Sequence, residues 1–569
     1  MVLKNITDNL LSFDSKHPRE FKKILNTFPE EYKLTQKQEE LLFNAYELGV
    51  KAHYGQKRKS GAKYFDHCIA VCNQLILWNM DINTIVAGLL HDTIEDTNVS
   101  SKELKKEFGN DITQLISGVS KLSGIKFRDS KHKQAENFMK MFLSLSQDLR
   151  VIIIKFADRL HNMKTIKYLP ENKQHRIAVE TRELYAPLAH RLGMNNIKTQ
   201  FEDLTFQVLD RKSYKDIRKK VKESYKQRDK HITKFCRNVK SEFKNYEIDA
   251  EVFGRAKHYY SIYKKMIKKT KLFSELYDIL AVRIIVDKTE ECYSVLGIVH
   301  QHYTPIQNRF KDYIATPKSN GYQSIHTTVF TENGEQLEMQ IRTKQMDELA
   351  EIGVAAHWKY KGDEISKISD NVVGDNFKWL RELVEILKSD ERDSNEMLEL
   401  LKIDLFQDEI FVFTPGGDVL ELKENSTPLD FAFAVHSDVG MRCKGAKVNG
   451  KIVPLNTTLN NGDKIEILTS PNQTPNQAWL KIVQTTKAKT RIKRYLKHEE
   501  EEKYIELGKE MLEKSLRKIK KYSYYKDIER NPEKIGFNNI NIVFSEIAQG
   551  KIIIKDLLIK FNIILEAQH

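Results

Sequence analysis

The sequence predicts a multidomain protein that combines an all-helical domain with α+β domains. Its 569 residues exceed what a single hydrophobic core organises, so about three or four domains are expected. Apolar residues recur at helical spacing over residues 36–200, whereas β-branched runs such as YDILAVRIIVD follow only after residue 271. This change of periodicity is typical of a helical domain followed by a mixed α/β domain.

Changes in charge and in hydrophobic periodicity divide the sequence into four segments. The expected domains are residues 1–204, 205–403, 404–469 and 470–569. The second segment opens with strongly basic helical sequence, and the last is mostly basic amphipathic helix. In the third, Pro415-Gly416-Gly417 and Asn449-Gly450 each separate two alternating strands, which indicates hairpins in a small β-rich module.

Charge and composition restrict the class of partner. The 93 basic residues outnumber the 79 acidic ones by 14, which favours phosphate-rich ligands or RNA through long-range attraction. An AT-rich genome that enriches lysine explains the excess equally well. There is no apolar stretch of about 18 residues and no secretory signal pattern, so a cytoplasmic protein with no membrane partner is expected.

The five cysteines are scattered along the chain and form no CxxC pair. They are Cys68, Cys72, Cys236, Cys292 and Cys443. This spacing predicts reduced thiols, and it argues against a disulfide framework and against a thiolate zinc site.

A first candidate site follows an apolar run in the helical segment. The run ends in His91-Asp92-Thr93-Ile94-Glu95-Asp96, and a continuous helix would place His91 and Glu95 on one face. His67 is expected near the start of an earlier helix, and Asp158 ends another apolar run. Burying several ionisable groups is costly unless a divalent cation compensates them, although a His-Asp pair alone is usually an ordinary surface or core pair. A mixed set of imidazole and carboxylate ligands suits Mn, Fe or Zn.

The order His, His-Asp, Asp resembles the HD phosphohydrolase superfamily. The resemblance implies the metal ligands His67, His91, Asp92 and Asp158, and it selects Mn²⁺. Glu95 and Asp96 are then expected to orient or deprotonate the attacking water, because a metal-bound water needs only a nearby base.

A loop upstream of His67 indicates one family within the HD superfamily. Arg58-Lys59-Ser60-Gly61 combines two cations, a hydroxyl and a glycine, which suits a phosphate, although such a tetrapeptide is more often a solvated turn. With this loop the segment resembles the Rel/Spo stringent-response enzymes, in which Arg58, Lys59, Ser60, Asn162 and Thr165 would bind the guanine nucleotide. The family commonly has prolines where this chain has Gly61-Ala62-Lys63, so the loop geometry is expected to differ.

A second candidate site lies in the mixed segment. GRAKHYYSIYKKM is rich in cations that could neutralise a triphosphate, although an ordinary basic helix explains it too. Asp278 begins one strand, and Glu338 lies in QLEMQIRT on the face opposite Leu337 and Met339. If these strands are close in one sheet, the two carboxylates are placed to share Mg²⁺ with nucleotide phosphates.

The long segment from Arg309 to His326 is similar to the synthetase signature of Rel/Spo enzymes. The resemblance implies a nucleotidyltransferase-like domain that binds nucleotides through Arg255, Lys257, Lys265, Arg309, Lys311, Lys318, Asn320, Tyr322 and His326. Tyr322 would stack on guanine, and Asp278 and Glu338 would be catalytic, with Glu338 activating the acceptor hydroxyl. The Arg-Phe-Lys-Asp tetrad at residues 309–312 resembles the bifunctional class.

The resemblance implies two opposed reactions on GDP/GTP, ATP and ppGpp/pppGpp. One transfers the β,γ-diphosphate of ATP to the 3′-hydroxyl of GDP or GTP and releases AMP, and the other hydrolyses the 3′-diphosphate to pyrophosphate. Both together would waste ATP, so a bistable arrangement is expected, coupled through the basic helices at 205–250.

The last two segments resemble further modules of long Rel/Spo proteins. Residues 404–469 resemble a TGS domain of β-grasp fold, in which His436 would approach uncharged tRNA, and residues 470–569 resemble the family's helical domain. A satisfied histidine at a helix end explains His436 equally well. Ribosome binding and an oligomer are further expectations from the family, and no segment resembles its zinc-finger, RNA-recognition or ACT modules.

Two alternatives stay open at this point. One is a hydrolase whose synthetase domain only binds regulatory nucleotide, and the other is a tRNA- or ribosome-binding sensor with vestigial catalysis. The complete set of metal and acid/base residues favours the bifunctional enzyme over both.

Overall fold

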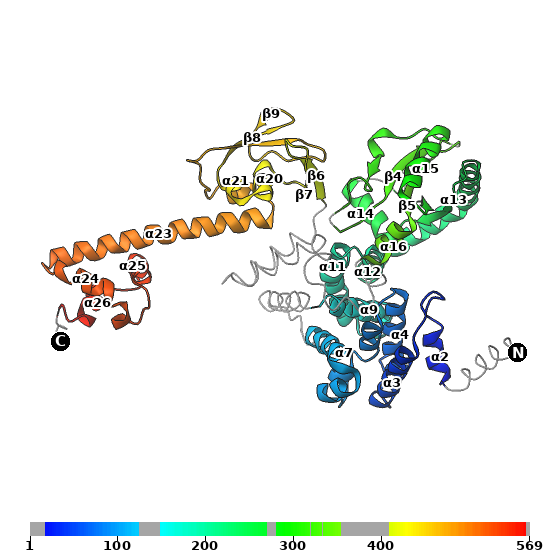
Figure 1. The fold of residues 1–569 in the computed structure, drawn as a ribbon, viewed down its shortest axis with the longest axis horizontal. Coiled ribbons are helices and arrows are strands. Elements are labelled where there is room, and N and C mark those ends of the chain that lie inside the picture. Colours follow the sequence, from blue (N-terminus) through cyan, green and yellow to red (C-terminus); the bar gives the residue numbers. More distant parts are fainter. Residues whose placement is uncertain are drawn as a thin grey trace. The chain divides into compact units, whose positions relative to one another are not determined.

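The computed structural model describes residues 17–123, 148–269, 273, 280–318, 320–332, 334–353 and 409–564. The chain divides into two compact units, Met1–Glu399 and Leu400–His569 (Figure 1). The expected combination of a helical domain, a mixed sheet, a β-rich module and a helical end is confirmed. No helix in the described parts is long and apolar enough to cross a membrane.

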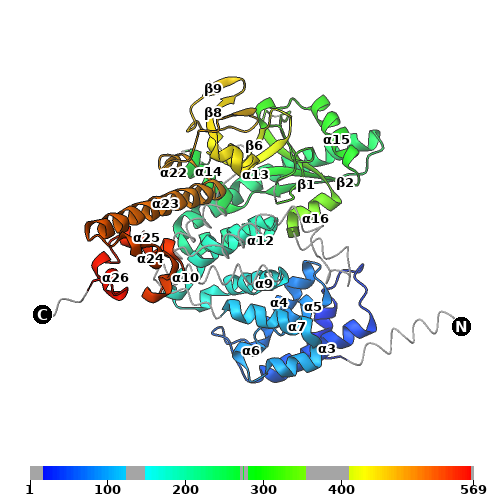
Figure 2. The ribbon, with the colours of Figure 1, turned by 60° about the vertical axis from the view of Figure 1, so that its left-hand side comes forward.

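The first domain is helical throughout its described residues. Its helices are α2 (Arg19–Leu25), α3 (Gln36–Ala52), α4 (Phe65–Leu77), α5 (Ile82–Leu89), α6 (Thr93–Asp96), α7 (Ser101–Ser123), α9 (Arg150–Lys164), α10 (Glu171–Glu180), α11 (Ala186–Arg191) and α12 (Asn195–Leu209). Helix α9 is central and packs against α4, α7 and α12 (Figure 2). Its run from Val151 to Asp158 is buried on every side, which explains why this stretch shows no polar face.

A continuous helix, which would have placed His91 and Glu95 on one face, is not present here. Helix α5 ends at Leu89 and the short helix α6 begins at Thr93, so a turn holds His91 and Asp92. The Nδ1 atom of His91 lies 2.9 Å from the carbonyl oxygen of Gly88, in the last turn of α5. Carbonyls at a helix end lack partners within the helix, so this contact stabilises the interruption.

Helix α12 continues past the expected boundary at residues 204 and 205. It runs unbroken to Leu209, and Asp210 then caps the long basic helix α13 (Arg211–Asn245) by accepting from the backbone N–H of Ser213. Helix α12 packs against α9 and α10 of the first domain and against α13, α14 (Tyr259–Lys269) and α16 (Lys344–Ile352) of the second. It is therefore shared by both domains.

The second domain is built on a five-stranded mixed sheet. The strands lie in the order β1 (Glu251–Ala256), β2 (Leu280–Val286), β5 (Gln336–Thr343), β4 (Ile325–Phe330) and β3 (Lys311–Asp312). Strands β2 and β5 are parallel, and the other pairs are antiparallel. Apolar side chains of the sheet pack against α13 and α15 (Thr289–His302). In β5, Leu337, Met339 and Ile341 are buried, as the alternation predicts.

The second unit begins with the β-rich module. Its elements are β6 (Glu409–Phe413), β7 (Val419–Lys423), α20 (Pro428–Val435), α21 (Ser437–Met441), β8 (Cys443–Val448), β9 (Lys451–Val453) and β10 (Ile465–Thr469). Both predicted hairpins, β6–β7 and β8–β9, are confirmed. Asn449 and Gly450 have φ of 50° and 81°, the left-handed values that a two-residue hairpin turn requires.

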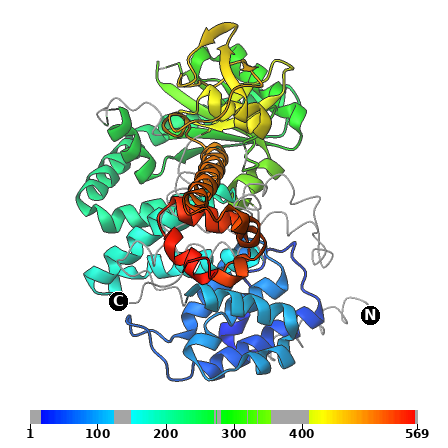
Figure 3. The ribbon, with the colours of Figure 1, turned by 90° about the vertical axis from the view of Figure 1, so that its left-hand side faces the viewer.

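The end of this unit is helical. It contains α22 (Trp479–Ile482), α23 (Thr486–Lys518), α24 (Tyr525–Arg530), α25 (Ile540–Ala548) and α26 (Ile554–Lys560). The last three helices gather at the C-terminal end of α23, drawn in red in Figure 3. The buried side chains of Leu512, Phe544 and Leu557 belong to the core that they share. The buried carboxylate of Asp430 accepts from the backbone N–H groups of Gln484 and Thr485, which ties α20 to the start of α23.

Candidate functional site

Four buried polar side chains converge inside the first helical domain. His67 lies in the first turn of α4, His91 and Asp92 lie between α5 and α6, and Asp158 lies on α9. The Nε2 atom of His67 lies 3.3 Å from Oδ1 of Asp158 and 3.6 Å from Oδ2 of Asp92. The Nε2 atom of His91 lies 3.1 Å from Oδ1 of Asp92. The structure thus brings together the four residues that were predicted as metal ligands of the first site.

This donor set fits a divalent cation. The contact of His91 Nδ1 with Gly88 directs Nε2 toward the carboxylates. That Nε2 atom is buried, and its contact with Asp92 is an ion pair without good hydrogen-bond geometry. Ligand atoms of His67, His91 and Asp158 all lie within 4.8 Å of one another. A cation here would bind this nitrogen and offset the charge of the buried carboxylates.

In the metal-free protein, electrostatic attraction between His91 and Asp92 shifts the pKa values of both groups. Burial alone would lower the pKa of His91, but the neighbouring carboxylate of Asp92 raises it to about 9. Burial opposes ionisation of Asp92, yet His91 holds the pKa of this carboxyl below its usual range. A cation that binds His91 must displace this proton, so metal binding is coupled to proton release.

Lys155 is a buried residue of this cluster that the sequence interpretation did not assign. Its Nζ atom donates to Oδ2 of Asp158 at 2.6 Å, from one turn earlier on α9. Burial alone would lower the pKa of Lys155, but attraction to Asp158 holds it above its ordinary value. The available signal was a lysine within the apolar run RVIIIKFADRL, where a charge is costly without a partner.

The predicted proton acceptors Glu95 and Asp96 are exposed, on α6. The hydroxyl of Tyr64 lies 2.6 Å from Oδ2 of Asp96 and 3.0 Å from Oδ2 of Asp92. Because a hydroxyl carries one hydrogen, Tyr64 donates to one of these carboxylates at a time. Tyr64 therefore connects a predicted metal ligand, Asp92, with a predicted base, Asp96.

Arg58 reaches from the loop before α4 to the side chains of α9. Its NH1 group lies 3.0 Å from Nδ1 of His161, and its NH2 group donates to Oδ1 of Asn162. Asn162 in turn donates to Oδ1 of Asp158, so the loop and the cluster belong to one network. Of the other predicted substrate-binding residues, Lys59 and Ser60 are exposed and Thr165 lies at the end of α9.

The second domain places a tyrosine, a histidine and a glutamate in a row. The hydroxyl of Tyr322 lies 2.8 Å from Nε2 of His326, and Nδ1 of His326 lies 3.8 Å from Oε1 of Glu338. Burial, together with Lys318 and other nearby cations, lowers the pKa of His326 to about 3. The imidazole is therefore neutral at physiological pH.

Glu338 lies at the centre of the sheet. Strands β2 and β5 are parallel neighbours with Ala281 opposite Glu338, so these two strands do share one sheet. Asp278, the predicted partner of Glu338 for Mg²⁺, lies outside the described residues. Its role stays a prediction.

The predicted phosphate-binding cations lie on several elements of the second domain. Arg255 lies on β1, Lys257 follows it, Lys265 lies on α14, Arg309 ends a short 3-10 turn and Lys311 begins β3. The Nζ atom of Lys318 lies 4.8 Å from the ring centroid of Tyr313 and 5.7 Å from that of Tyr322. Asn320 donates through Nδ2 to the carbonyl oxygen of His190, which lies in the first domain.

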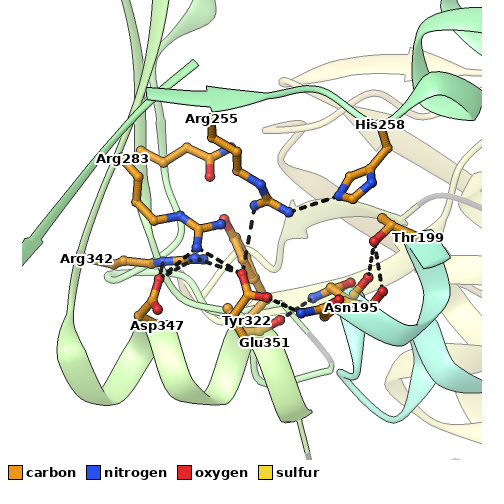
Figure 4. Close-up of polar contacts among 12 residues, drawn as sticks. Asn195, Thr199, Arg255, His258, Arg283, Tyr322, Arg342, Asp347 and Glu351 are labelled. Atoms are coloured by element: carbon orange, nitrogen blue, oxygen red, sulfur yellow. Dashed lines mark hydrogen bonds and ion pairs between the residues drawn. The ribbon is translucent and has the colours of Figure 1, made fainter. Parts of the chain in front are cut away.

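Two further arginines, absent from the predicted set, lie beside Arg255 (Figure 4). Arg283 on β2 and Arg342 on β5 are both buried. NH1 of Arg283 donates to Oε1 of Glu351 at 2.9 Å, and Nε of Arg342 donates to Oδ1 of Asp347 at 2.7 Å. Arginines inside β-branched runs were the available signal, because a buried guanidinium needs an anionic partner.

His436, for which a tRNA contact was predicted, is the N-cap of α21. Its Nδ1 atom accepts from the backbone N–H of Asp438 at 3.3 Å. The side chain is nevertheless 66% exposed. One ring therefore caps a helix and faces solvent as well.

Models of known protein families match four parts of the chain. Family models match as an HD domain over residues 45–195, a "Region found in RelA / SpoT proteins" over 254–365, a TGS domain over 410–469 and a "RelA/SpoT AH domain" over 495–559. The bifunctional (p)ppGpp synthase/hydrolase SpoT of Escherichia coli is 42% identical over 511 residues, which are 90% of this chain and 72% of that protein. The chain belongs to the RelA/SpoT family.

Other RelA/SpoT relatives carry names for both activities. A guanosine-3′,5′-bis(diphosphate) 3′-pyrophosphohydrolase of Aquifex aeolicus is 45% identical over 88% of this chain and 70% of its own length. A GTP pyrophosphokinase of Myxococcus xanthus is 46% identical over 84% of this chain and 63% of its own length. The chain thus spans between 58% and 72% of the first curated relatives that it matches.

The family match indicates the type of reaction for which the first cluster is suited. An HD domain is that of a hydrolase dependent on a divalent metal, and this one covers all four converging residues. The RelA/SpoT region covers Arg255 through Glu351, and so contains the second candidate site.

Proposed function

We propose that this RelA/SpoT protein is a bifunctional alarmone enzyme. In one direction it hydrolyses the 3′-diphosphate of ppGpp or pppGpp, yielding GDP or GTP and pyrophosphate. In the other it transfers the β,γ-diphosphate of ATP to the 3′-hydroxyl of GDP or GTP and releases AMP. The observation that carries the proposal is that each of the two domains holds its own convergent set of acidic and basic side chains.

In the hydrolase site, His67, His91, Asp92 and Asp158 would hold Mn²⁺, which acidifies water and neutralises phosphate charge. Asp96, hydrogen-bonded to Tyr64, lies where it can accept the proton of the attacking water, with Glu95 beside it. Arg58 presents a guanidinium next to Asn162 and so can bind the phosphates.

In the synthetase site, Glu338 would accept the proton of the attacking 3′-hydroxyl and contribute with Asp278 to a Mg²⁺ site. The ring of His326 lies between Glu338 and Tyr322 and is uncharged. The carboxylate of Glu338 therefore has no imidazolium beside it to compete for the proton-accepting oxygen. Arg255, Lys257, Lys265, Arg309, Lys311 and Lys318 are the cations proposed for the phosphates, because phosphoryl transfer depends on positioned positive charge.

The experiment is a reciprocal knockout in the full chain. With Mn²⁺ and ppGpp, Asp92→Ala should release no pyrophosphate, yet it should still form AMP from ATP and GDP with Mg²⁺. Glu338→Gln should give the opposite pattern, with both reactions followed by nucleotide chromatography. Hydrolysis that persists in Asp92→Ala would refute the metal assignment, and loss of both reactions in Glu338→Gln would refute two separate sites.

For the second unit we propose a contact with uncharged tRNA and the ribosome. The exposed ring of His436 favours this, since a residue needed only as a helix cap does not require a histidine. In a filter-binding assay His436→Asn, which keeps a capping side chain, should weaken tRNA binding; unchanged binding would show that the residue only caps α21.

A further inference from the structure

Helix α4 brings a cysteine to the end of α5. Val71 and Leu75 follow Cys68 by one and two turns, and α4 packs against α5. The two helices approach closely at Gly88, where an added Cβ atom would lie 2.2 Å from Cδ1 of Leu75 and 3.6 Å from Cγ1 of Val71. Because α5 ends just after this point, the first turn of α4 lies beside the turn that follows α5.

The thiol of Cys68 belongs to a second group of possible metal ligands. Its Sγ atom and ligand atoms of His91 and Asp92 all lie within 4.8 Å of one another, and the three side chains are buried. The carbonyl oxygen of Gly88 lies 2.9 Å from Nδ1 of His91, so Nε2 is the nitrogen that can bind a cation. Oδ1 of Asp92 lies 3.1 Å from that Nε2 atom. Sulfur, nitrogen and oxygen donors therefore converge inside the hydrolase domain.

These three donors suit a different cation from those of the first group. Zn²⁺ binds Cys sulfur, His nitrogen and carboxylate oxygen, and zinc sites with three protein ligands keep a fourth position for water or substrate. A thiolate selects thiophilic cations, whereas carboxylates and water suit Mn²⁺. The spacing of the five cysteines argues against a zinc site built from several thiolates, but a site with one thiol needs no second cysteine.

The two groups of ligands exclude each other. They share His91, and Asp92 is itself one of the predicted ligands of Mn²⁺. A single imidazole nitrogen binds one cation at a time. A cation held by Cys68 therefore leaves only His67 and Asp158 for Mn²⁺.

We propose that Cys68, His91 and Asp92 form an alternative site for a thiophilic divalent cation of the Zn²⁺ class, and that this cation excludes Mn²⁺ from the hydrolase site. Binding forms a bond between the metal and Sγ of Cys68, breaks the S–H bond and releases its proton to solvent. The inference rests on the proposed hydrolase function, since it assumes that His91 and Asp92 bind Mn²⁺.

The test uses Co²⁺ as a spectroscopic probe for Zn²⁺. A bond between Co²⁺ and a thiolate gives a charge-transfer absorption band in the near ultraviolet. The full chain, freed of metal by a chelator, is titrated with Co²⁺ without oxygen, and absorbance and affinity are recorded. In the wild type we expect the band to reach a plateau at one Co²⁺ per chain. Excess Mn²⁺ should then weaken the band, because both cations need His91.

Two variants remove the thiol, Cys68→Ser with a hydroxyl in its place and Cys68→Ala without one. Both should abolish the band and weaken Co²⁺ binding by at least about tenfold, the smaller effect typical even of partners of metal ligands. Binding of Mn²⁺, measured by calorimetry, should change little because sulfur is not among its predicted ligands. Cys72→Ser is the matched control: this cysteine lies one turn later on α4, is equally buried, and its loss should leave the band unchanged.

The consequence for the reaction is measured with Zn²⁺ itself. At a fixed Mn²⁺ concentration, Zn²⁺ should slow pyrophosphate release from ppGpp in the wild type, and additional Mn²⁺ should restore it. Cys68→Ser and Cys68→Ala should need at least about tenfold more Zn²⁺ for the same inhibition. Cys72→Ser should respond like the wild type.

The outcomes distinguish the two proposals. If the wild type binds neither Co²⁺ nor Mn²⁺, the proposed hydrolase site fails and the inference fails with it. If Co²⁺ binds and Mn²⁺ displaces it, but the band is missing or is equally strong in Cys68→Ser and Cys68→Ala, the thiol is no ligand while the proposed function stands. Melting temperatures of all variants establish that each compared protein is folded.

Discussion

The Nζ atom of Lys155 lies 2.6 Å from Oδ2 of Asp158, and both side chains are buried. The ion pair occupies one oxygen of Asp158 and leaves Oδ1 turned toward His67. A cation that joins this cluster meets two carboxylates whose charge is partly offset by a fixed ammonium. Lys155 therefore controls both the orientation of Asp158 and the net charge of the site.

Replacing Lys155 by methionine should destabilise the first unit and slow hydrolysis. In metal-free protein the change leaves the buried carboxylate of Asp158 without its cation, which costs about 3–5 kcal/mol. Hydrolysis of ppGpp should fall roughly 10- to 100-fold, as for other partners of metal ligands. Urea unfolding and pyrophosphate release measure the two effects. Lys164→Met, at an exposed position on the same helix, should change neither, and a similar loss there would contradict the assignment.

Tyr64→Phe should impair the hydrolase selectively. The substitution keeps the ring that stacks on His53 and removes the hydroxyl that contacts Asp92 and Asp96. We expect pyrophosphate release to fall roughly tenfold or more, because the carboxylates lose their common donor, while AMP formation from ATP and GDP is unchanged. Tyr54→Phe, where the side chain is 88% exposed, serves as control. Unaltered hydrolysis in Tyr64→Phe would exclude a role for this hydroxyl.

Mn²⁺ should stabilise the chelator-treated protein against heat. A ligand that binds only the folded state adds about 2.7 kcal/mol at a hundredfold excess over its Kd, which should appear as an increase of several degrees in melting temperature. His91→Ala should abolish the increase because it removes the Nε2 atom that would bind the cation. His175→Ala, at an exposed position of α10, should retain it. An equal increase in both variants would mean that Mn²⁺ binds elsewhere.

Gly353→Ala and Gly297→Ala should have opposite effects on stability. At Gly353 the added methyl meets backbone atoms of the hydrolase domain at 2.4–2.6 Å and φ is positive, so we expect a loss of about 2 kcal/mol or more. At Gly297, in α15, nothing lies within 4 Å of the added methyl, so the higher helix propensity of alanine should add about 0.5–1 kcal/mol. Thermal unfolding compares the two, and a tolerated Gly353→Ala would disprove the close crossing.

Much of the local structure could be predicted because it depends on neighbours in the chain. The alternation in β5 places Glu338 on the face opposite Met339, and Asn449-Gly450 forms its hairpin turn, since both depend on backbone geometry over a few residues. The candidates His67, His91 and Asp158 could be selected as polar residues within or beside apolar runs. The order of these residues along the chain was enough to recognise the resemblance to the HD superfamily without a structure.

The partners of buried charges were decided by tertiary structure alone. Arg283 and Glu351 are 68 positions apart, and Asn196 and Glu351 are 155 apart, so no spacing in the sequence indicates that they meet. The break at His91 likewise depends on what the turned side chain meets inside the domain, so local periodicity could not decide whether the helix continues there. Helix and turn preferences are short-range energies that the sequence determines by itself, whereas the pairing of a buried charge depends on which distant group the fold brings within hydrogen-bond distance.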